Sequence, residues 1–246
     1  MNHFDATVVI PAYNERLSIQ KTLELLSNLR GVELEVLVIV DSETDKTIEF
    51  FHSSISKPTN STILVQNYGS GPANAIRYGI DRARAECVVV MMADGSDDAR
   101  VIPELVNLVS RGVVVACASR YMSGGQQIGG PRFKRFLSKT AGSILHLLAG
   151  VDTHDPTNSF KAYSKSFIKT VGIDSRAGFE IGIELISKAR RRRLPIAEIP
   201  TVWLDRAAGD SNFQLGKWIP QYFKWFKFCF GPEIRTKVSN RETDAT

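Results

Sequence analysis

Three aspartates stand close together in the segment MMADGSDD (91–98), directly after a run rich in valine. Carboxylate oxygens are the ligands that hard cations such as Mg²⁺ and Mn²⁺ prefer, and such a cation can carry a diphosphate group. The segment therefore predicts a metal–diphosphate site that includes Asp94. Asp97 and Asp98 have a second interpretation, because a carboxylate just before a helix also satisfies the free N–H groups of its first turn.

Two other segments carry side chains suited to a nucleotide. In PAYNE (11–15) a proline ends one apolar run, and in VDSETDKT (40–47) an aspartate follows the end of another. The Asp41 carboxylate can accept an N–H group from a nucleobase, and Tyr13 can flank the ring. Asp45, by contrast, is interpreted as the cap of the next helix.

Phosphate-binding potential is found in a glycine turn and in several basic loops. The turn NYGSGPANAIRYG (67–79) opens a helix whose N-terminus could face phosphate groups, although a plain tight turn fits the sequence equally well. Arginine matches phosphate oxygens in pairs, and lysine offers a point charge. The basic residues predicted in loops beyond strand ends are Arg120, Arg132, Lys134, Arg135 and Arg206.

Two carboxylates of the second half, Asp155 and Glu180, are candidates for a general base. A hydroxyl nucleophile would need such a base, whereas a phosphate is already an anion near neutral pH and needs none. Asp155 could instead orient a sugar or brace the turn before Pro156. Glu184 lies in an otherwise apolar helix pattern and would be costly if buried alone, so we expect it to pair with Arg206.

Predicted strands and helices alternate along the chain. Short runs rich in valine and isoleucine lack polar alternation, as is typical of strands buried on both faces, and helix patterns separate them. This alternation predicts a mostly parallel sheet with helices on both faces, whose ligands bind beyond the carboxyl ends of the strands. The predicted strands are Thr7–Ile10, Leu34–Val40, Thr62–Val65, Cys87–Met92 and Val113–Ser119.

The second half is less regular. A glycine-rich, basic stretch after Ser119 predicts a mobile loop. The run of four arginines at 190–193 is interpreted as a solvated helix end, where positive charge complements the helix dipole. The further elements predicted are a helix over 136–149, a strand over 159–163, a helix over 179–190 and a strand over 196–202.

Composition bounds the remaining possibilities. The chain has 246 residues, 43% of them apolar and 23% charged, which excludes a disordered or fibrous protein. Its three cysteines lack the spacing of a zinc site or a disulfide framework, so a reducing compartment is expected. The net charge of +5 suits anionic lipid or phosphate ligands and does not indicate nucleic acid. No leader and no run of about 20 apolar residues is found, so any membrane contact is expected to be peripheral.

The motifs together carry a resemblance to a known family. PAYNE, VDSETDKT and MMADGSDD resemble the nucleotide-binding half of family 2 glycosyltransferases of the GT-A fold, and SRYMSGG, DPTNSFKAY, GFEIGIEL and DRAAGDS look like its polyprenyl-phosphate (dolichol-phosphate) mannosyltransferase branch. The resemblance covers roughly residues 5–215. It implies a GT-A-type Rossmann-like domain over 1–215, with a nucleotide-binding half at 1–119 and an acceptor half at 120–215.

The same resemblance implies an activity. It implies inverting transfer of a hexose from a nucleoside-diphosphate sugar, with GDP-mannose and UDP-glucose as the candidates, to a polyprenyl phosphate, with Mg²⁺ or Mn²⁺ as cofactor. The place expected is the cytoplasmic face of a membrane, at the lipid surface or beside a membrane-protein partner. Two alternatives remain: transfer to a soluble or polysaccharide hydroxyl acceptor, and a non-catalytic nucleotide-sugar-binding protein.

Roles carry over residue by residue. The family's DxD motif corresponds to Met92-Ala93-Asp94, so its first aspartate is a methionine here, and Asn212 stands where relatives often carry lysine. The methionine in place of the first aspartate motivates the non-catalytic alternative. The implied donor-binding residues are Pro11, Ala12, Tyr13, Glu15, Asp41, Ala93, Asp94 and Ser211; the implied metal ligands are Asp94, Ser96 and Asp97; and the implied catalytic residues are Asp94, Arg120, Arg135 and Arg206.

A last helix is predicted at 216–232, followed by a disordered tail at 233–246. Wound as a helix, it places aromatic residues on one stripe and basic or polar residues on another. The stripe could lie in a membrane interface, or it could pack on the domain while the lysines face water. The aromatic stripe is Trp218, Tyr222, Trp225, Phe226 and Cys229, and the basic one is Lys217, Gln221, Lys224 and Lys227.

Overall fold

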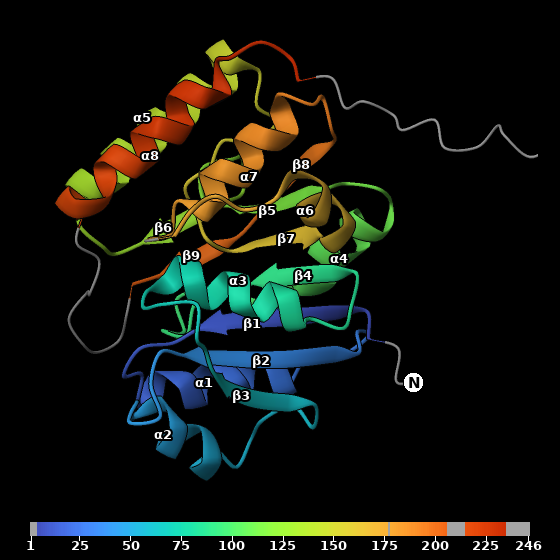
Figure 1. Ribbon diagram of the computed structural model, residues 1–246, viewed down its shortest axis with the longest axis vertical. Helices are drawn as coiled ribbons and strands as arrows, with labels where there is room; N and C mark the ends of the chain where they lie inside the picture. Colours follow the sequence, from blue (N-terminus) through green and yellow to red (C-terminus); the bar gives the residue numbers. More distant parts are fainter. Residues whose placement is uncertain (1–3, 177, 206–214, 235–246) are drawn as a thin grey trace, which may run out of the picture.

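The computed structural model describes residues 4–176, 178–205 and 215–234, and its centre is a large sheet between helical layers (Figure 1). Its order is β3-β2-β1-β4-β7-β5-β8, and only β7 is antiparallel to its neighbours. The predicted mostly parallel α/β sheet is confirmed. The strands are β1 Ala6–Pro11, β2 Leu34–Val40, β3 Ser61–Val65, β4 Cys87–Val90, β5 Val115–Ser119, β7 Lys161–Ser164 and β8 Ile196–Pro200.

Helices cover both faces of this sheet, because successive strand residues point to opposite sides and both sides are apolar. In β1, Val8 and Ile10 pack into one core and Val9 into the other. One core is closed by α1, α2 and α4, and the other by α3, α6 and α7. The helices are α1 Leu17–Ser27, α2 Thr47–Ser53, α3 Pro72–Arg82, α4 Ile102–Ser110, α5 Arg132–Ala149, α6 Lys165–Val171, α7 Ile181–Arg190 and α8 Leu215–Cys229, with a short 3₁₀ helix η1 at Ala99–Val101.

The segment after Ser119 differs from its prediction as a mobile loop. It contains a short strand, β6 (Gln126–Ile128), and helix α5 begins already at Arg132. Strand β6 pairs with β9 (Val202–Leu204), of which the strand predicted over 196–202 includes only the first residue. A three-residue strand with two glutamines has no local apolar pattern, so only its pairing with a distant segment stabilises it.

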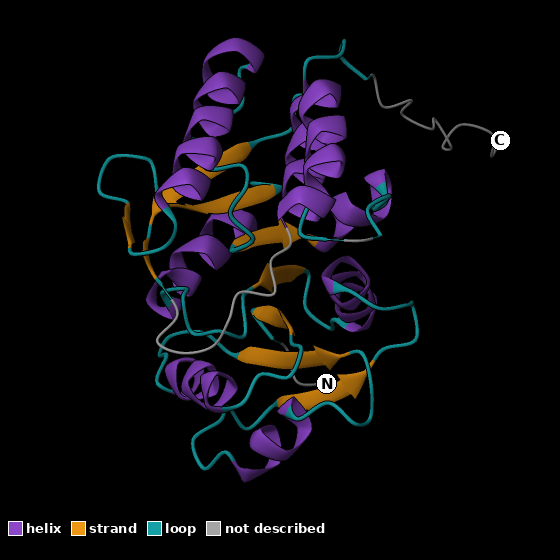
Figure 2. Cartoon of the chain, turned by 90° about the vertical axis from the view of Figure 1, so that its left-hand side faces the viewer, coloured by secondary structure: helices purple, strands orange, loops and turns teal. Residues whose placement is uncertain are grey.

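Helices α5 and α8 form an outer layer over α7 (Figures 1 and 2). Helix α5 approaches the loop before β7 so closely that a Cβ atom added at Gly142 would lie 2.1 Å from the His154 carbonyl oxygen. A side chain at this position would push the helix off the loop. Gly142 therefore fixes where α5 lies relative to the DPTN segment.

The predicted aromatic stripe of the last helix packs on the domain. Trp225 and Cys229 are buried, and Tyr222 and Phe226 pack against the same apolar core. The side chain of Trp218 lies outside the described residues. These four described members of the stripe therefore contact the domain core, as the packing interpretation predicts.

Arg190 and Arg191 fasten this outer layer, whereas Arg193 is exposed at the helix end as predicted. Arg190 donates from Nε to the carbonyl of Ala149 at the end of α5 (2.6 Å) and from Nη1 to the carbonyl of Cys229 at the end of α8 (3.0 Å). Arg191 donates to the carbonyl of Pro232. Helix ends leave carbonyl groups unpaired, so one guanidinium satisfies two helices at once. From residue 235 on, the predicted tail lies outside the described residues.

Glu184 is paired, although its expected partner Arg206 lies outside the described residues. Its carboxylate contacts Lys188 Nζ at 2.6 Å, one turn along α7, and accepts the N–H groups of Asp174 and Ser175. The indole N–H of Trp225 donates to the Ser175 hydroxyl. This buried ion pair thus orders the loop on which α8 packs.

Candidate active site

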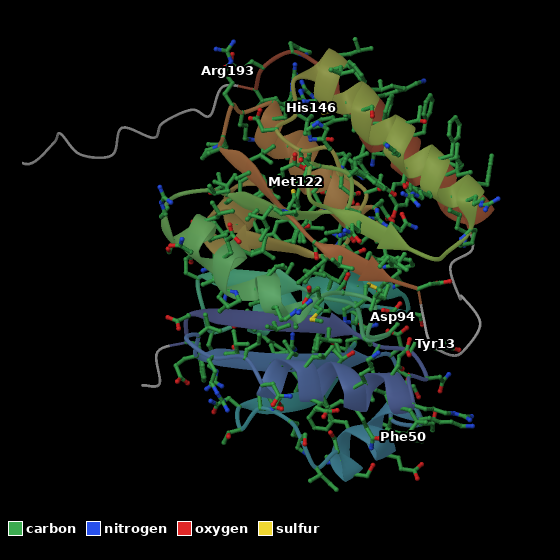
Figure 3. The ribbon with its side chains drawn as sticks, turned by 180° about the vertical axis from the view of Figure 1, so that it is seen from behind. Tyr13, Phe50, Asp94, Met122, His146 and Arg193 are labelled. Atoms are coloured by element: carbon green, nitrogen blue, oxygen red, sulfur yellow. The ribbon has the colours of Figure 1, made fainter. Side chains whose placement is uncertain are left out.

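The sequence motifs meet at the carboxyl ends of neighbouring strands. Strand β1 lies between β2 and β4, so PAYNE, VDSETDKT and MMADGSDD emerge side by side. Figure 3 shows Tyr13 and Asp94 near each other at this edge and Arg193 at the far end of the molecule. The site therefore forms where the parallel topology predicts it.

The acidic loop after β4 is internally bonded. Asp94 Oδ1 accepts the backbone N–H of Ser96 (3.0 Å) and its hydroxyl (2.5 Å). Asp97 Oδ2 accepts the N–H of Met92 at 3.0 Å, so Asp97 is not a helix cap. Asp98 does cap η1, through the N–H of Arg100. The loop thus holds the carboxylates of Asp94 and Asp97 on the same short turn.

Asp97 is a buried acid with an altered proton affinity. Burial, and after it the negative charge of Asp94, raise its pKa from 3.8 to about 7, while the Met92 N–H group and the positive charges of Arg120 and Lys161 oppose the change. A cation bound between these carboxylates would relieve both causes. The electrostatics of this loop therefore favour binding of a cation.

The residues present fit a divalent cation held partly by its substrate. In the described part of the chain no three histidine, cysteine, aspartate or glutamate side chains converge on one point. Mg²⁺ is commonly held by one or two carboxylates together with substrate phosphates and water, and the Asp94 and Asp97 carboxylates meet that need. The Ser96 side chain is buried and bonded to Asp94, so here it orients a carboxylate.

On the other side of β1, Asp41 is fixed by two donors. Its Oδ2 accepts the N–H of Gly71 (2.9 Å) and its Oδ1 accepts the side-chain amide of Gln66 (2.7 Å). Tyr13 lies beside this end of the sheet with 58% of its side chain exposed, as a ring that stacks on a ligand would. Pro11 and Ala12 are buried backbone positions at the end of β1.

The PAYNE turn is held by the start of α2. Asp45 accepts the N–H groups of Asn14 (3.1 Å) and of Thr47, the first residue of α2 (2.8 Å), so it joins the PAYNE turn to the start of this helix. The N–H of Glu15 donates to the Thr47 hydroxyl, and the Glu15 carboxylate accepts the hydroxyl of Ser18. Asn14 has φ = 52°, which asparagine adopts more readily than most residues.

A second charged group lies after β5. Arg120 contacts Asp155 through Nε–Oδ2 (2.7 Å) and Nη2–Oδ1 (2.9 Å), and its backbone N–H donates to the same carboxylate. Burial favours the neutral acid, but the Arg120 charge and hydrogen bonds outweigh it and hold the pKa of Asp155 below its ordinary value. Asp155 is thus an ionised brace for Arg120, and this engagement disfavours it as a general base.

The other predicted cations are distributed differently. Arg135 is exposed in the first turn of α5 and donates to the carbonyl of Gln127 at 3.3 Å. Tyr121 connects Arg120 with the start of α5. Its hydroxyl hydrogen-bonds Gln127 (2.9 Å) and Ser138 of α5, and the Arg120 guanidinium lies over its ring. Of the remaining predicted residues, Arg132 and Lys134 lie on the same turn of α5, Ala93 is buried beside Asp94, Glu180 is buried and accepts the N–H of Gly178, and Arg206, Ser211 and Asn212 lie outside the described residues.

Three participants were missed by sequence reasoning. Lys161 is fully buried in β7, donates to the carbonyl of Asn158, and adds positive charge near Asp97 and Asp155. Gln66 and Tyr121 act through hydrogen bonds to residues far along the chain or in another element. A lysine within a strand pattern was the one available signal, since a buried charge needs a partner.

Comparison with known proteins assigns the chain to a family. The family model described as "Glycosyl transferase family 2" matches residues 7–172. A dolichol-phosphate mannosyltransferase of Pyrococcus furiosus is 30% identical over 222 residues, which are 89% of this chain and 61% of that protein. A polyprenol monophosphomannose synthase of Mycolicibacterium smegmatis is 28% identical over 212 residues, covering 83% of this chain and 79% of that one. The chain thus spans less than two thirds of the Pyrococcus relative.

Among solved structures, glucosyl-3-phosphoglycerate synthase from Mycobacterium tuberculosis, in complex with Mn²⁺, UDP and glucosyl-3-phosphoglycerate, superposes with a TM-score of 0.69. The superposition covers 93% of this chain and 81% of that one at 18% sequence identity. At this identity the likeness establishes the fold alone, and it confirms the predicted GT-A architecture.

The raised pKa of Asp97 leads to a prediction on stability. An acid that binds its proton more tightly when folded makes the free energy of unfolding fall as pH rises from about 4 to about 7. In chelator, Asp97→Asn should therefore exceed the wild type in stability by about 1–4 kcal/mol at pH 8 and match it near pH 4. Urea denaturation across this pH range measures the difference.

Asp98→Asn is the matched control. Its carboxylate is paired with Arg100, and that hydrogen bond holds its pKa below the ordinary value, so neutralising it should lower stability above pH 4. A difference between wild type and Asp97→Asn that stays constant from pH 4 to pH 8 would contradict the electrostatic account of this loop.

Proposed function

The chain belongs to glycosyl transferase family 2, and from this premise we propose that it transfers a hexose from a nucleoside-diphosphate sugar to a polyprenyl phosphate at a membrane surface. The observation that carries the proposal is Arg120, a guanidinium held by the buried Asp155 carboxylate and electrostatically coupled to Asp97. A cation beside the loop that carries Asp94 and Asp97 can bind an anionic acceptor close to the donor phosphates. The printed names of the two relatives, a dolichol-phosphate mannosyltransferase and a polyprenol monophosphomannose synthase, support the same acceptor class.

The donor half binds and orients the nucleotide in this proposal. Asp41 accepts N–H groups of the base, Tyr13 flanks its ring, and Pro11, Ala12 and Glu15 shape the turn that carries Tyr13. Asp94, with Asp97 behind it, would hold Mg²⁺ or Mn²⁺ on the donor diphosphate, and the cation would supply neutralising charge for the departing nucleoside diphosphate. Ala93 and Ser211 complete the predicted donor set.

The acceptor half provides positive charge and no base. Arg120, Arg135 and Arg206 seat the lipid phosphate, which is ionised near neutral pH and so carries its own nucleophilic oxygen. That oxygen forms a bond to the anomeric carbon while the bond from this carbon to the diphosphate oxygen breaks. Attack from the face opposite the leaving group inverts the configuration at this carbon.

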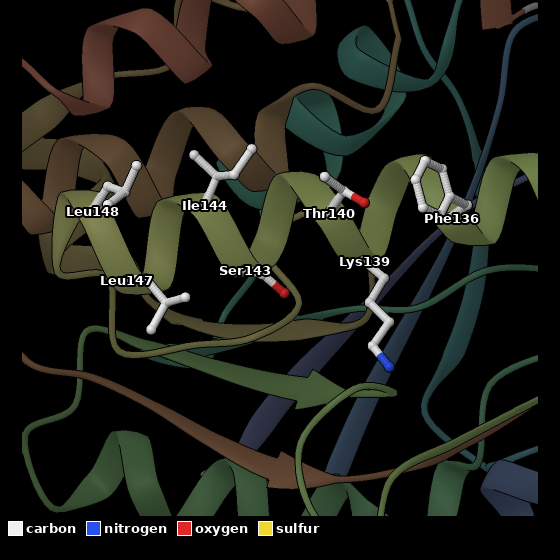
Figure 4. Close-up of a pocket in the computed structure, with 7 residues that line it drawn as sticks. All are labelled: Phe136, Lys139, Thr140, Ser143, Ile144, Leu147 and Leu148. Atoms are coloured by element: carbon white, nitrogen blue, oxygen red, sulfur yellow. The ribbon is translucent and has the colours of Figure 1, made fainter.

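The lipid contact in this proposal lies on α5. Leu147 and Leu148 are about three-quarters exposed, at 75% and 74%, and Phe133 and Phe136 about two-thirds, at 67% and 66%. Phe136, Lys139, Leu147 and Leu148 lie along the helix and line one pocket there (Figure 4). The exposed apolar face begins at the turn that carries Arg135, so a lipid phosphate seated there places its chain along α5.

Charge supports a membrane over other occupants of this face. The first two turns of α5 carry Arg132, Lys134, Arg135 and Lys139, and the neighbouring α8 exposes Lys224 and Lys227. Basic residues next to exposed apolar ones favour an anionic lipid surface. No helix in the described part of the chain is long and apolar enough to cross a bilayer. We propose that the protein acts at the cytoplasmic face of a membrane, alone or beside a membrane protein.

The acceptor class is tested by labelled GDP-mannose and UDP-glucose offered with polyprenyl phosphate, with free sugars, or with a polysaccharide. We expect product with the lipid phosphate alone. Product on hydroxyl acceptors alone would favour the alternative acceptor, and donor binding with no turnover would favour the non-catalytic alternative that Met92 motivates.

The second test addresses Asp94. Asp94→Ala should abolish transfer, and excess chelator should do the same to the wild type, because the departing diphosphate would lose its counter-charge. The matched control, Asp98→Ala, removes a carboxylate of the same loop that pairs with Arg100. Met92→Asp restores the motif's first acid and is expected to tighten Mn²⁺ binding. Full activity of Asp94→Ala would show that the carboxylate is not required.

The third test addresses α5. Leu147→Glu with Leu148→Glu should abolish sedimentation with anionic liposomes and reduce transfer to polyprenyl phosphate, while nucleotide binding persists, because two acids oppose burial in an anionic interface. Ile55→Glu is the control, since Ile55 is fully exposed but lies after α2. Unchanged sedimentation of the folded double variant would place the membrane contact elsewhere.

A further inference from the structure

Gln66 occupies an unusual place beside the predicted nucleobase site. It follows the last residue of β3, only 6% of it is exposed, and its backbone N–H continues the ladder to the carbonyl of Val40. Its side-chain Nε2 donates to Asp41 Oδ1 (2.7 Å) and to the carbonyl of Gly69 (2.6 Å). Its Oε1 accepts the N–H of Tyr68 at 2.6 Å. Both hydrogens of the amide and its oxygen are thus engaged.

These contacts fix the orientation of the Asp41 carboxylate. Gln66 holds Oδ1, and the N–H of Gly71 holds Oδ2 at 2.9 Å. The same amide ties the carboxylate to the turn at Gly69 and Gly71, which have φ = 99° and 109° and so need glycine. Two oxygens offer about four lone-pair sites, of which two are used here, so the carboxylate can still accept hydrogen bonds in a set direction.

A carboxylate held in one orientation discriminates between bases. A base that presents N–H groups in that direction is bound, whereas one that presents a carbonyl or ring-nitrogen lone pair faces a negative charge and leaves polar groups unpaired. A carboxylate free to rotate could adapt to either. The fixed geometry therefore matters more for the choice of base than for affinity to the diphosphate.

We infer that Gln66 is a positioning residue that sets nucleobase selection by holding Asp41 and the 67–71 turn in one geometry. The inference rests on the proposed nucleotide-sugar activity and deepens it. Gln66 does not touch the reacting atoms; it acts through Asp41. Its amide must be neutral and a donor, because an acid at this place would oppose the Asp41 charge at hydrogen-bond distance.

The experiment measures binding of GDP, UDP, CDP and ADP in Mn²⁺ by calorimetry, and binding of inorganic pyrophosphate by competition. Gln66→Glu keeps the shape and removes the donor, and Gln66→Met removes all hydrogen bonds without adding charge. Gln20→Glu makes the same chemical change on α1, where the amide bonds the carbonyl of Phe50 and the hydroxyl of Ser53. Thermal unfolding reports whether each variant is folded.

We expect the wild type and Gln20→Glu to prefer one nucleotide by at least about tenfold. Both Gln66 variants should weaken binding of that nucleotide by about tenfold and reduce the preference to about threefold or less, with pyrophosphate binding unchanged. In transfer assays KM for the donor should rise while kcat changes little, because ground-state and transition-state binding are lost together.

Three outcomes would overturn the inference. Folded Gln66 variants that keep the wild-type preference would show that another group selects the base. Parallel loss of pyrophosphate and nucleotide binding would show that Gln66 supports the fold of the whole site. A wild type that binds no nucleoside diphosphate would overturn the proposed function together with this inference, whereas transfer by the Gln66 variants with unchanged preference would overturn the inference alone.

Discussion

The interaction on which the site depends is the buried ion pair of Arg120 and Asp155. Its two parallel hydrogen bonds join the end of β5 to the loop before β7, and Asp155 is fully buried. An ionised carboxylate is stable there only because a guanidinium meets it. The positive charges of Arg120 and the buried Lys161 also favour the ionised form of Asp97 and so lower its pKa. The loop after β4, which carries Asp94 and Asp97, and the segment after β5, which begins with Arg120, therefore interact through their charges.

This arrangement separates rigid from exposed parts of the site. Asp41, Asp94, Asp97 and Asp155 each accept hydrogen bonds from neighbouring residues, so their carboxylates have defined orientations before a ligand arrives. Such preorganisation lowers the cost of ordering groups on binding. Tyr13 and the basic first turn of α5, by contrast, are exposed and can adjust to a ligand.

A second ionic cluster, remote from the site, holds the outer helices in place. Lys188 and Glu184 order the loop on which Trp225 of α8 packs, and Arg190 binds carbonyls at the ends of both α5 and α8. The aromatic stripe of α8 packs on the domain, whereas α5 exposes Phe133, Phe136, Leu147 and Leu148, and α8 itself exposes Ile219 and Phe223. Arginines of the 190–193 segment thus stabilise the packing of the outer helices, whereas the basic residues near the carboxyl ends of the strands can bind anions.

Local sequence signals were sufficient to predict the α/β class and the parallel strands from β1 to β5, because valine-rich runs and helix periods do not depend on distant segments. They also predicted that Tyr13, Asp41 and Asp94 gather at one edge, because parallel topology brings strand ends together. Tertiary structure alone decided the partners of the charged groups, including Asp155 for Arg120 and Lys188 for Glu184. It also decided that Trp225 is buried while Leu148 is exposed, although both are apolar residues of amphipathic helices. The reason is physical: a side chain's partner and burial depend on segments far along the chain, which no local pattern specifies.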